Sequence, residues 1–89
     1  MTVKMKQFGE CLVTRQDAKN ILQAIGSFKV ISSFDFAGVD VANHGFADEL
    51  WKGLASKLSY SALAKVKLTG TNEYVKNCLE AGFATAVRQ

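Results

Sequence analysis

The sequence predicts a small α/β domain with a mostly parallel sheet of four to five strands and about three helices, in the order β(β)αβαβα(β). Two observations lead to this fold class. Stretches with helical apolar periodicity alternate along the chain with short strand-like stretches, which is typical of right-handed crossovers between parallel strands. The chain of 89 residues, 48% hydrophobic and 21% charged, suits one domain over residues 1–89, because two cores would each be too small to fold unaided.

The first predicted element is a half-buried edge strand over residues 2–8. Apolar residues alternate there with Lys4 and Lys6, which we expect to face solvent. Gly9-Glu10 then predicts a turn, and Cys11 to Val13 a short returning strand, so that the N-terminal segment would form a small hairpin.

A first helix is predicted to start at Thr14, with Thr14 as its cap and Asp17 near the positive end of the helix dipole. Its apolar stripe is followed by Gly26, which we expect to end the helix; the stripe consists of Ala18, Ile21, Leu22 and Ile25. Arg15 is a cation in the first turn, where the dipole disfavours it. It is either solvated or paired with an acid from elsewhere in the fold.

A central strand is predicted over residues 29–36, ending in a turn at Ala37-Gly38. Val30, Phe34 and Phe36 would lie on one of its faces and Ile31 on the other. We expect Asp35, near its carboxyl end, to accept backbone N–H groups of the following turn.

A loop over residues 39–45 then leads into a second helix that is predicted to begin at Phe46. Asp48 and Glu49 would lie in its first turn, in agreement with the dipole. Its buried stripe is expected to consist of Phe46, Ala47, Leu50, Trp51, Leu54 and Leu58.

The C-terminal third predicts an edge strand over residues 62–68 and a third helix that begins after Gly70-Thr71-Asn72 and stops at Gly82. Residues 83–87 would be a last edge strand or a closing extension. The polar loops after Phe36 and after Leu68, at the ends of two predicted strands, should then open on the same edge of the sheet.

Several site classes find no support in the residue pattern. Cys11 and Cys78 lack metal-ligand or redox spacing and are expected to be buried, reduced thiols. The acids around His44 lack a recognised metal-ligand spacing, and no glycine-rich phosphate loop occurs. As a general base, His44 would need a nucleophile or an orienting carboxylate within hydrogen-bond reach, and loop geometry allows Asp40 to be that carboxylate. We therefore expect no metal, no cofactor and no enzymatic activity.

The charge pattern does not favour nucleic acid, because the net charge of +3 comes from interspersed signs rather than a basic block. Binding through Lys4, Lys6, Lys65 and Lys67 would require these lysines to share one face. The chain begins without a signal-peptide core and contains no apolar run long enough for a membrane span. We expect a cytoplasmic protein without a membrane partner; the pattern leaves its oligomeric state open.

Four segments resemble a known family. They are G-x-x-L-V-T-R-x-x-A (residues 9–18), F-D-F-A-G-V (34–39), F-A-D-E-L-W (46–51), and Thr71-Asn72 with Val75. Together they resemble a bacterial and archaeal family of small STAS-like domains of unknown function, which is similar in fold to the STAS domains of anti-sigma-factor antagonists.

The resemblance implies a non-enzymatic regulator in signal transduction that docks a GHKL-type ATPase or kinase. In the antagonists a serine before the second helix is phosphorylated to break the complex; here that loop reads Ala42-Asn43-His44-Gly45 and offers no hydroxyl. The partner surface expected from the loop, the helix start and the resemblance consists of Arg15, Asp40, Asn43, His44, Gly45, Asp48, Glu49 and Asn72. The alternative is a sensor that binds a small anionic ligand or a nucleotide in the same crevice, at helix N-termini.

Overall fold

The strands form two separate parallel sheets rather than one. In the computed structural model, which describes residues 2–26 and 31–87, β1 (Thr2–Lys4), β3 (Ser33–Asp35) and β5 (Lys67–Thr69) make a sheet of order β1-β3-β5. β2 (Cys11–Leu12) and β4 (Val41–Ala42) make a second, two-stranded sheet. The prediction of a small α/β domain with parallel strands is confirmed, and that of a single sheet is corrected to two.

The predicted N-terminal hairpin is wrong. After β1 the chain turns into a short 3-10 helix, η1 (Met5–Phe8), which Gly9 ends with a φ of 135°. β2 then pairs in parallel with β4, with Cys11 opposite Val41. The predicted apolar alternation is confirmed for Val3 and Met5, which are buried, but the helical turn carries the chain away from β1 before it can return along it.

α1 (Arg15–Ile25) begins and ends as predicted. The Thr14 side chain accepts a hydrogen bond from the Asp17 backbone N–H, and the Asp17 carboxylate accepts one from the Thr14 N–H, so the two form a capping box. Gly26 follows with a φ of 76°, a left-handed backbone that glycine adopts without strain.

α2 (His44–Ala55) begins two residues before the predicted start, because the Asn43 side chain caps it by accepting the Phe46 N–H at 3.0 Å. Asp48 and Glu49 therefore lie in the second turn rather than the first. Five residues of the predicted stripe are buried as expected, namely Phe46, Ala47, Leu50, Trp51 and Leu54, whereas Leu58 lies beyond the end of the helix and is half-buried.

Only the end of the predicted strand over residues 62–68 is a strand. α3 (Tyr60–Ala64) occupies its first part. The preceding residue, Ser59, caps this helix, because its side chain accepts the Ala62 N–H. Alanines carry the alternation in this stretch, and alanine is a strong helix former with little side chain to bury in a sheet. The chain becomes extended only at β5.

α4 (Glu73–Val87) starts as predicted after Asn72, whose side chain accepts the Val75 N–H at 2.8 Å. It does not stop at Gly82, so the predicted last strand or extension is a continuation of the helix. Gly82 serves helix packing instead: a Cβ there would lie 2.9 Å from the backbone carbon of Ala47 and 3.0 Å from Trp51.

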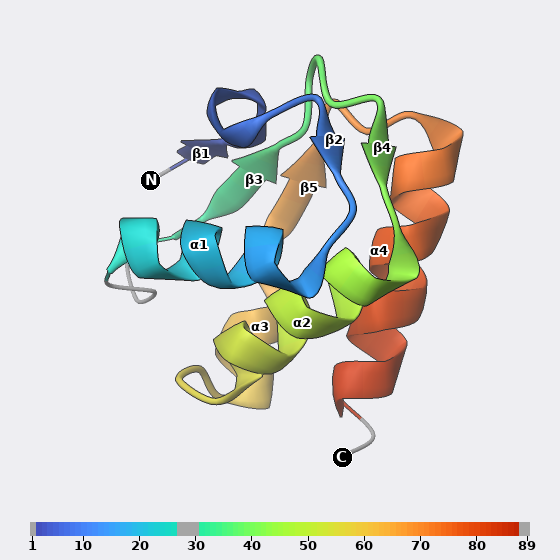
Figure 1. The fold of residues 1–89 in the computed structure, drawn as a ribbon. Helices are drawn as coiled ribbons and strands as arrows, with labels where there is room; N and C mark the ends of the chain where they lie inside the picture. The colour runs from blue at the N-terminus through green and yellow to red at the C-terminus, as the bar shows by residue number, and fades with distance from the viewer. Residues whose placement is uncertain (1, 27–30, 88–89) are drawn as a thin grey trace.

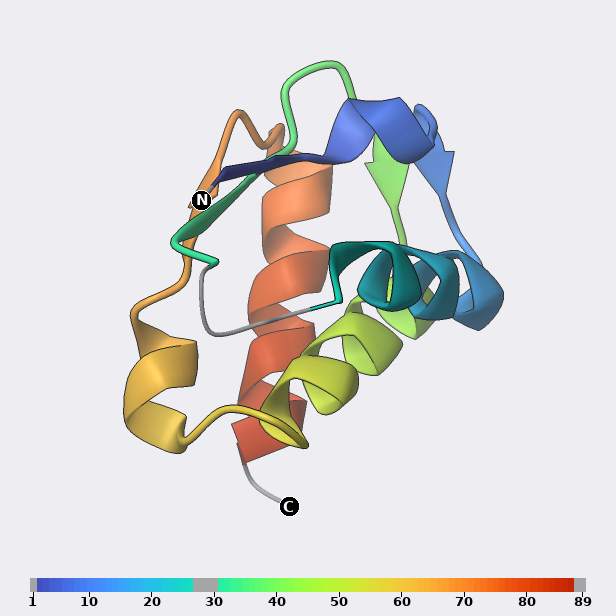
Figure 2. The same cartoon turned by 90° about the vertical axis from the view of Figure 1, so that its left-hand side faces the viewer.

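The helices α1, α2 and α4 lie on one side of the three-stranded sheet, as Figures 1 and 2 show from two directions. β3 is its central strand and places Phe34 in the core, as predicted, with Phe36 and Ile31 also buried. The part of that prediction concerning residues 29 and 30 lies outside the described residues. The Trp51 indole N–H donates to the Leu79 carbonyl at 2.8 Å, which joins α2 to α4 inside the core.

Within residues 2–26 and 31–87, no helix combines the length and apolar character needed to cross a membrane. The two cysteines are free; Cys78 is buried as expected, whereas Cys11 is exposed, contrary to expectation. The next residue of β2, Leu12, is buried. Because successive side chains of a strand point to opposite faces, the Cys11 thiol faces outward.

Candidate functional site

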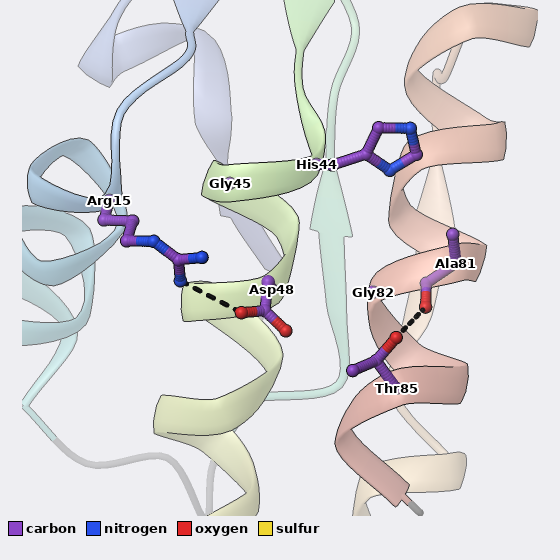
Figure 3. Close-up of a pocket in the computed structure, with 7 residues that line it drawn as sticks. All are labelled: Arg15, His44, Gly45, Asp48, Ala81, Gly82 and Thr85. Atoms are coloured by element: carbon purple, nitrogen blue, oxygen red, sulfur yellow. Dashed lines mark hydrogen bonds and ion pairs between the residues drawn. The ribbon is translucent and has the colours of Figure 1, made fainter.

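A pocket of about 230 Å³ opens between the start of α2, the start of α1 and the C-terminal half of α4 (Figure 3). α1 contributes one side chain and α2 contributes three residues, while α4 closes the other side. The lining residues are Arg15, His44, Gly45, Asp48, Ala81, Gly82 and Thr85. Four of them belong to the partner surface expected from the sequence: Arg15, His44, Gly45 and Asp48.

Ion pairs hold α1 to α2 at this pocket. Arg15 Nη1 lies 2.9 Å from Asp48 Oδ2 and 3.6 Å from Glu49 Oε1, and Lys52 Nζ lies 3.2 Å from the same Asp48 oxygen. Of the two alternatives for Arg15, the paired one therefore holds. Two carboxylates of α2 lie beside the Arg15 guanidinium, which explains how a cation is tolerated in the first turn of α1.

The hydrogen bond between Arg15 and Asp48 shifts both groups. It holds the pKa of Asp48 below its usual value, with Lys52 adding to the effect and partial burial opposing it. The same hydrogen bond raises the pKa of Arg15 further above its usual value. Both groups are therefore charged in the neutral range, which favours the ion pair between them.

His44 is the first residue of α2 and is exposed, with its ring directed toward α4 (Figure 3). Its Nε2 lies 3.9 Å from Cys78 Sγ. Among the residues that the structure describes, His44 has no carboxylate at hydrogen-bond distance, so Asp40 does not orient its ring. A general base needs such an orienting group or a nucleophile within reach, and the hydrogen-bond contact with the buried Cys78 thiol is a long one at 3.9 Å.

Other predicted residues lie outside the pocket. Asn72 Nδ2 donates to the Asp40 carbonyl at 3.0 Å, which ties the loop before β4 to the start of α4. Asn43 uses its side chain to cap α2. Glu49 reaches the cluster only through its ion pair with Arg15. Asp40 and Asn72 thus form a separate contact, and Asn43 has a role in local structure.

Reasoning from the sequence missed the α4 side of the pocket. Ala81, Gly82 and Thr85 line it, but a helix predicted to stop at Gly82 has no such face. Gly82 follows Val75, Cys78 and Leu79 at helical spacing, and a glycine in such a buried stripe is a usable signal for close helix packing. Lys52 was also missed, although it follows Asp48 at the i,i+4 spacing that ion pairs on helices use.

No cluster of three or more metal-binding side chains occurs in the described part of the chain. Asp35 has the structural role expected of it, because its Oδ1 accepts the Ala37 N–H at 2.9 Å. The pocket wall carries one paired cation, Arg15, one acid, Asp48, and the exposed imidazole of His44.

Comparison of the chain with models of protein families finds no match, and comparisons with curated proteins and with solved structures also find none.

Proposed function

We propose that this chain is a STAS-like regulatory module of the cytoplasm that docks a protein partner, an ATPase of the kinase type, without catalysing a reaction itself. The docking surface consists of the pocket residues Arg15, His44, Gly45 and Asp48 together with Glu49. The family assignment comes from the sequence resemblance, and the parallel α/β fold with a polar pocket at a helix start is compatible with it.

One observation supports the docking surface above all others. Arg15 and Asp48, far apart in the chain, meet at 2.9 Å beside the exposed His44. Each charge is paired with the other, so a partner would meet a cation and an anion held side by side. Such an arrangement favours one partner over another by electrostatic complementarity.

The residues at the start of α2 support a partner complex that is not switched by serine phosphorylation. The stretch Ala42-Asn43-His44-Gly45 has no hydroxyl group. The exposed residue at the first helical position is His44, so we propose that the complex is constitutive, with the imidazole as a contact group.

The alternative of a small anionic ligand in the same pocket is less well supported. Asp48 lines the pocket together with Arg15, and the guanidinium already donates to that carboxylate. An anion would have to displace Asp48 or lie against it, and like charges at this distance repel.

The proposal is tested by affinity capture from a lysate of the source organism with three versions of the chain. Wild type is compared with His44→Glu, and Gln23→Glu on the exposed side of α1 serves as the control with the same charge change. We expect wild type and Gln23→Glu to retain one ATP-binding kinase-type protein, identified by mass spectrometry, and His44→Glu to lose it. Retention by all three versions would exclude the pocket as the docking surface, and retention of no specific protein would count against the docking function.

A further inference from the structure

In the described part of the chain, α1, α2 and α4 leave one face of the three-stranded sheet uncovered. Parallel sheets occur almost only with both faces covered, yet α1, α2 and α4 all lie on the same side of β1, β3 and β5 (Figure 2). The covered face buries Val3 and Phe34. The outer face is formed by the residues that alternate with these along the strands.

The strand register identifies the side chains of this outer face. Thr2 pairs with Ser33 and Ser33 with Lys67, while Lys4 pairs with Asp35 and Asp35 with Thr69. Paired residues of parallel strands point to the same side of a sheet, so one face carries Thr2, Lys4, Ser33, Asp35, Lys67 and Thr69. The four residues on the two outer strands are exposed and the two on β3 are half-buried.

We propose that this outer sheet face binds the phosphate backbone of double-stranded nucleic acid. Lys4 and Lys67 supply the charge, and they lie on β1 and β5, the two edge strands, so that they flank the face from both sides. Adjacent strands are about 4.8 Å apart, which separates these edge strands by roughly 10 Å, and the minor groove of B-DNA is about 6 Å wide. Lysine side chains can thus reach phosphates on either side of such a groove.

The remaining side chains of the face fit the same class of ligand. Hydroxyl groups contact phosphate oxygens in protein–DNA complexes, and Thr2 Oγ1 and Ser33 Oγ lie 2.8 Å apart on the surface. The face carries no aromatic side chain on which bases of a single strand would stack. Contacts limited to phosphates favour a duplex, bound without preference for sequence.

Asp35 is the one acid of the face, and its removal should strengthen DNA binding where removal of the lysines should weaken it. Its Oδ1 accepts the Ala37 N–H, a bond that the amide oxygen of asparagine can keep. Asp35→Asn therefore removes a negative charge from the face and preserves the turn.

The experiment measures fluorescence anisotropy of a short labelled DNA duplex at a series of low salt concentrations. We expect wild type to bind with a slope of log K against log salt of about −2, because two lysines neutralise two phosphates. Lys4→Gln with Lys67→Gln should flatten that slope by about 2, roughly 1 for each lysine. Asp35→Asn should tighten binding roughly two- to fivefold, a gain that a folding defect cannot produce.

The control is the pair Lys19→Gln with Lys76→Gln, two exposed lysines on α1 and α4 with the same total charge change. It should leave the slope within the error of wild type. Equal losses for both lysine pairs would show attraction by net charge alone and overturn the proposal. Absence of binding by wild type at the lowest salt, or no gain with Asp35→Asn, would do the same. Because the outer face and the pocket are on different elements, neither result bears on partner docking.

Discussion

The two faces of α2 differ in burial and in charge, although their residues are neighbours in the sequence. One face packs Phe46, Leu50 and Leu54 into the core with no measurable exposure. The other carries Asp48 and Glu49, which remain partly exposed and pair with a side chain of α1. Stability resides mainly in the apolar face, since burial of each large side chain contributes about 1.5 to 3 kcal/mol and an exposed ion pair contributes less than about 1. The polar face is therefore free to change with little cost to the fold.

The largest effect is expected from truncation of the apolar face. Leu50→Ala should lower the free energy of unfolding by about 2 to 5 kcal/mol, because it removes a fully buried side chain and leaves a cavity. Leu58→Ala is the matched control and should cost less, since Leu58 lies beyond the helix and is half-buried. Urea denaturation measures both; equal losses, or a Leu50→Ala loss below about 0.5 kcal/mol, would contradict the assigned face.

An intermediate effect is expected where α2 meets α4. Gly82→Ala should destabilise the fold by about 1 to 2 kcal/mol, because the new Cβ meets the backbone of Ala47 and an overpacking cost outweighs the gain in helix propensity. Gly53→Ala is the control: its Cβ would meet only the end of the flexible Leu22 side chain. We expect a smaller change there, measured by thermal unfolding. A Gly82→Ala variant as stable as wild type would show that α2 and α4 can move apart.

The smallest effect is expected on the polar face, and it depends on pH. Because the Arg15 hydrogen bond lowers the pKa of Asp48 below its usual 3.8, the carboxylate stabilises the folded state above that value and loses this contribution as the pH falls through the lowered pKa. Asp48→Asn should therefore cost less than about 1 kcal/mol at neutral pH.

The same variant should match wild type under acid conditions, below the lowered pKa, where Asp48 is protonated in both states of the wild-type chain. Unfolding followed by circular dichroism across the acid range measures the difference, with Asp40→Asn as an exposed control. A deficit that persists unchanged at the lowest pH would mean that Asp48 acts through packing and not through its charge.

Local signals predicted the starts of α1 and α4 and missed what depends on distant contacts. Thr14, followed by Asp17, contains its own capping partner and could be read from the sequence. Gly82 was read as a helix stop because glycine is poor in helix interiors, yet the distant Ala47 and Trp51 lie so close that only glycine fits there. The pairing of Cys11 with Val41 depends in the same way on a distant strand.

For the candidate site, too, the sequence predicted the residues marked by local signals and not the contacts between distant segments. The loop and helix start drew attention to His44, Gly45 and Asp48, which do line one pocket. The resemblance and the unfavourable position of Arg15 predict a role for it, but the sequence has eight acids and does not indicate that Asp48 is its partner. Asp40 and Asn72 were grouped with the site by their place at strand ends, whereas the separate sheet of β2 and β4 places their mutual hydrogen bond elsewhere.

Every strand pairing among residues 2–26 and 31–87 is parallel, and that constrains the order in which the protein can fold. Thr2 pairs with Ser33, and Phe34 with Leu68, so no hairpin can form early from neighbouring residues. A chain emerging from the ribosome cannot complete its larger sheet until β5 has been synthesised. We expect the helices to collapse first and strand pairing to limit the folding rate, since contacts between distant residues require long loops to close.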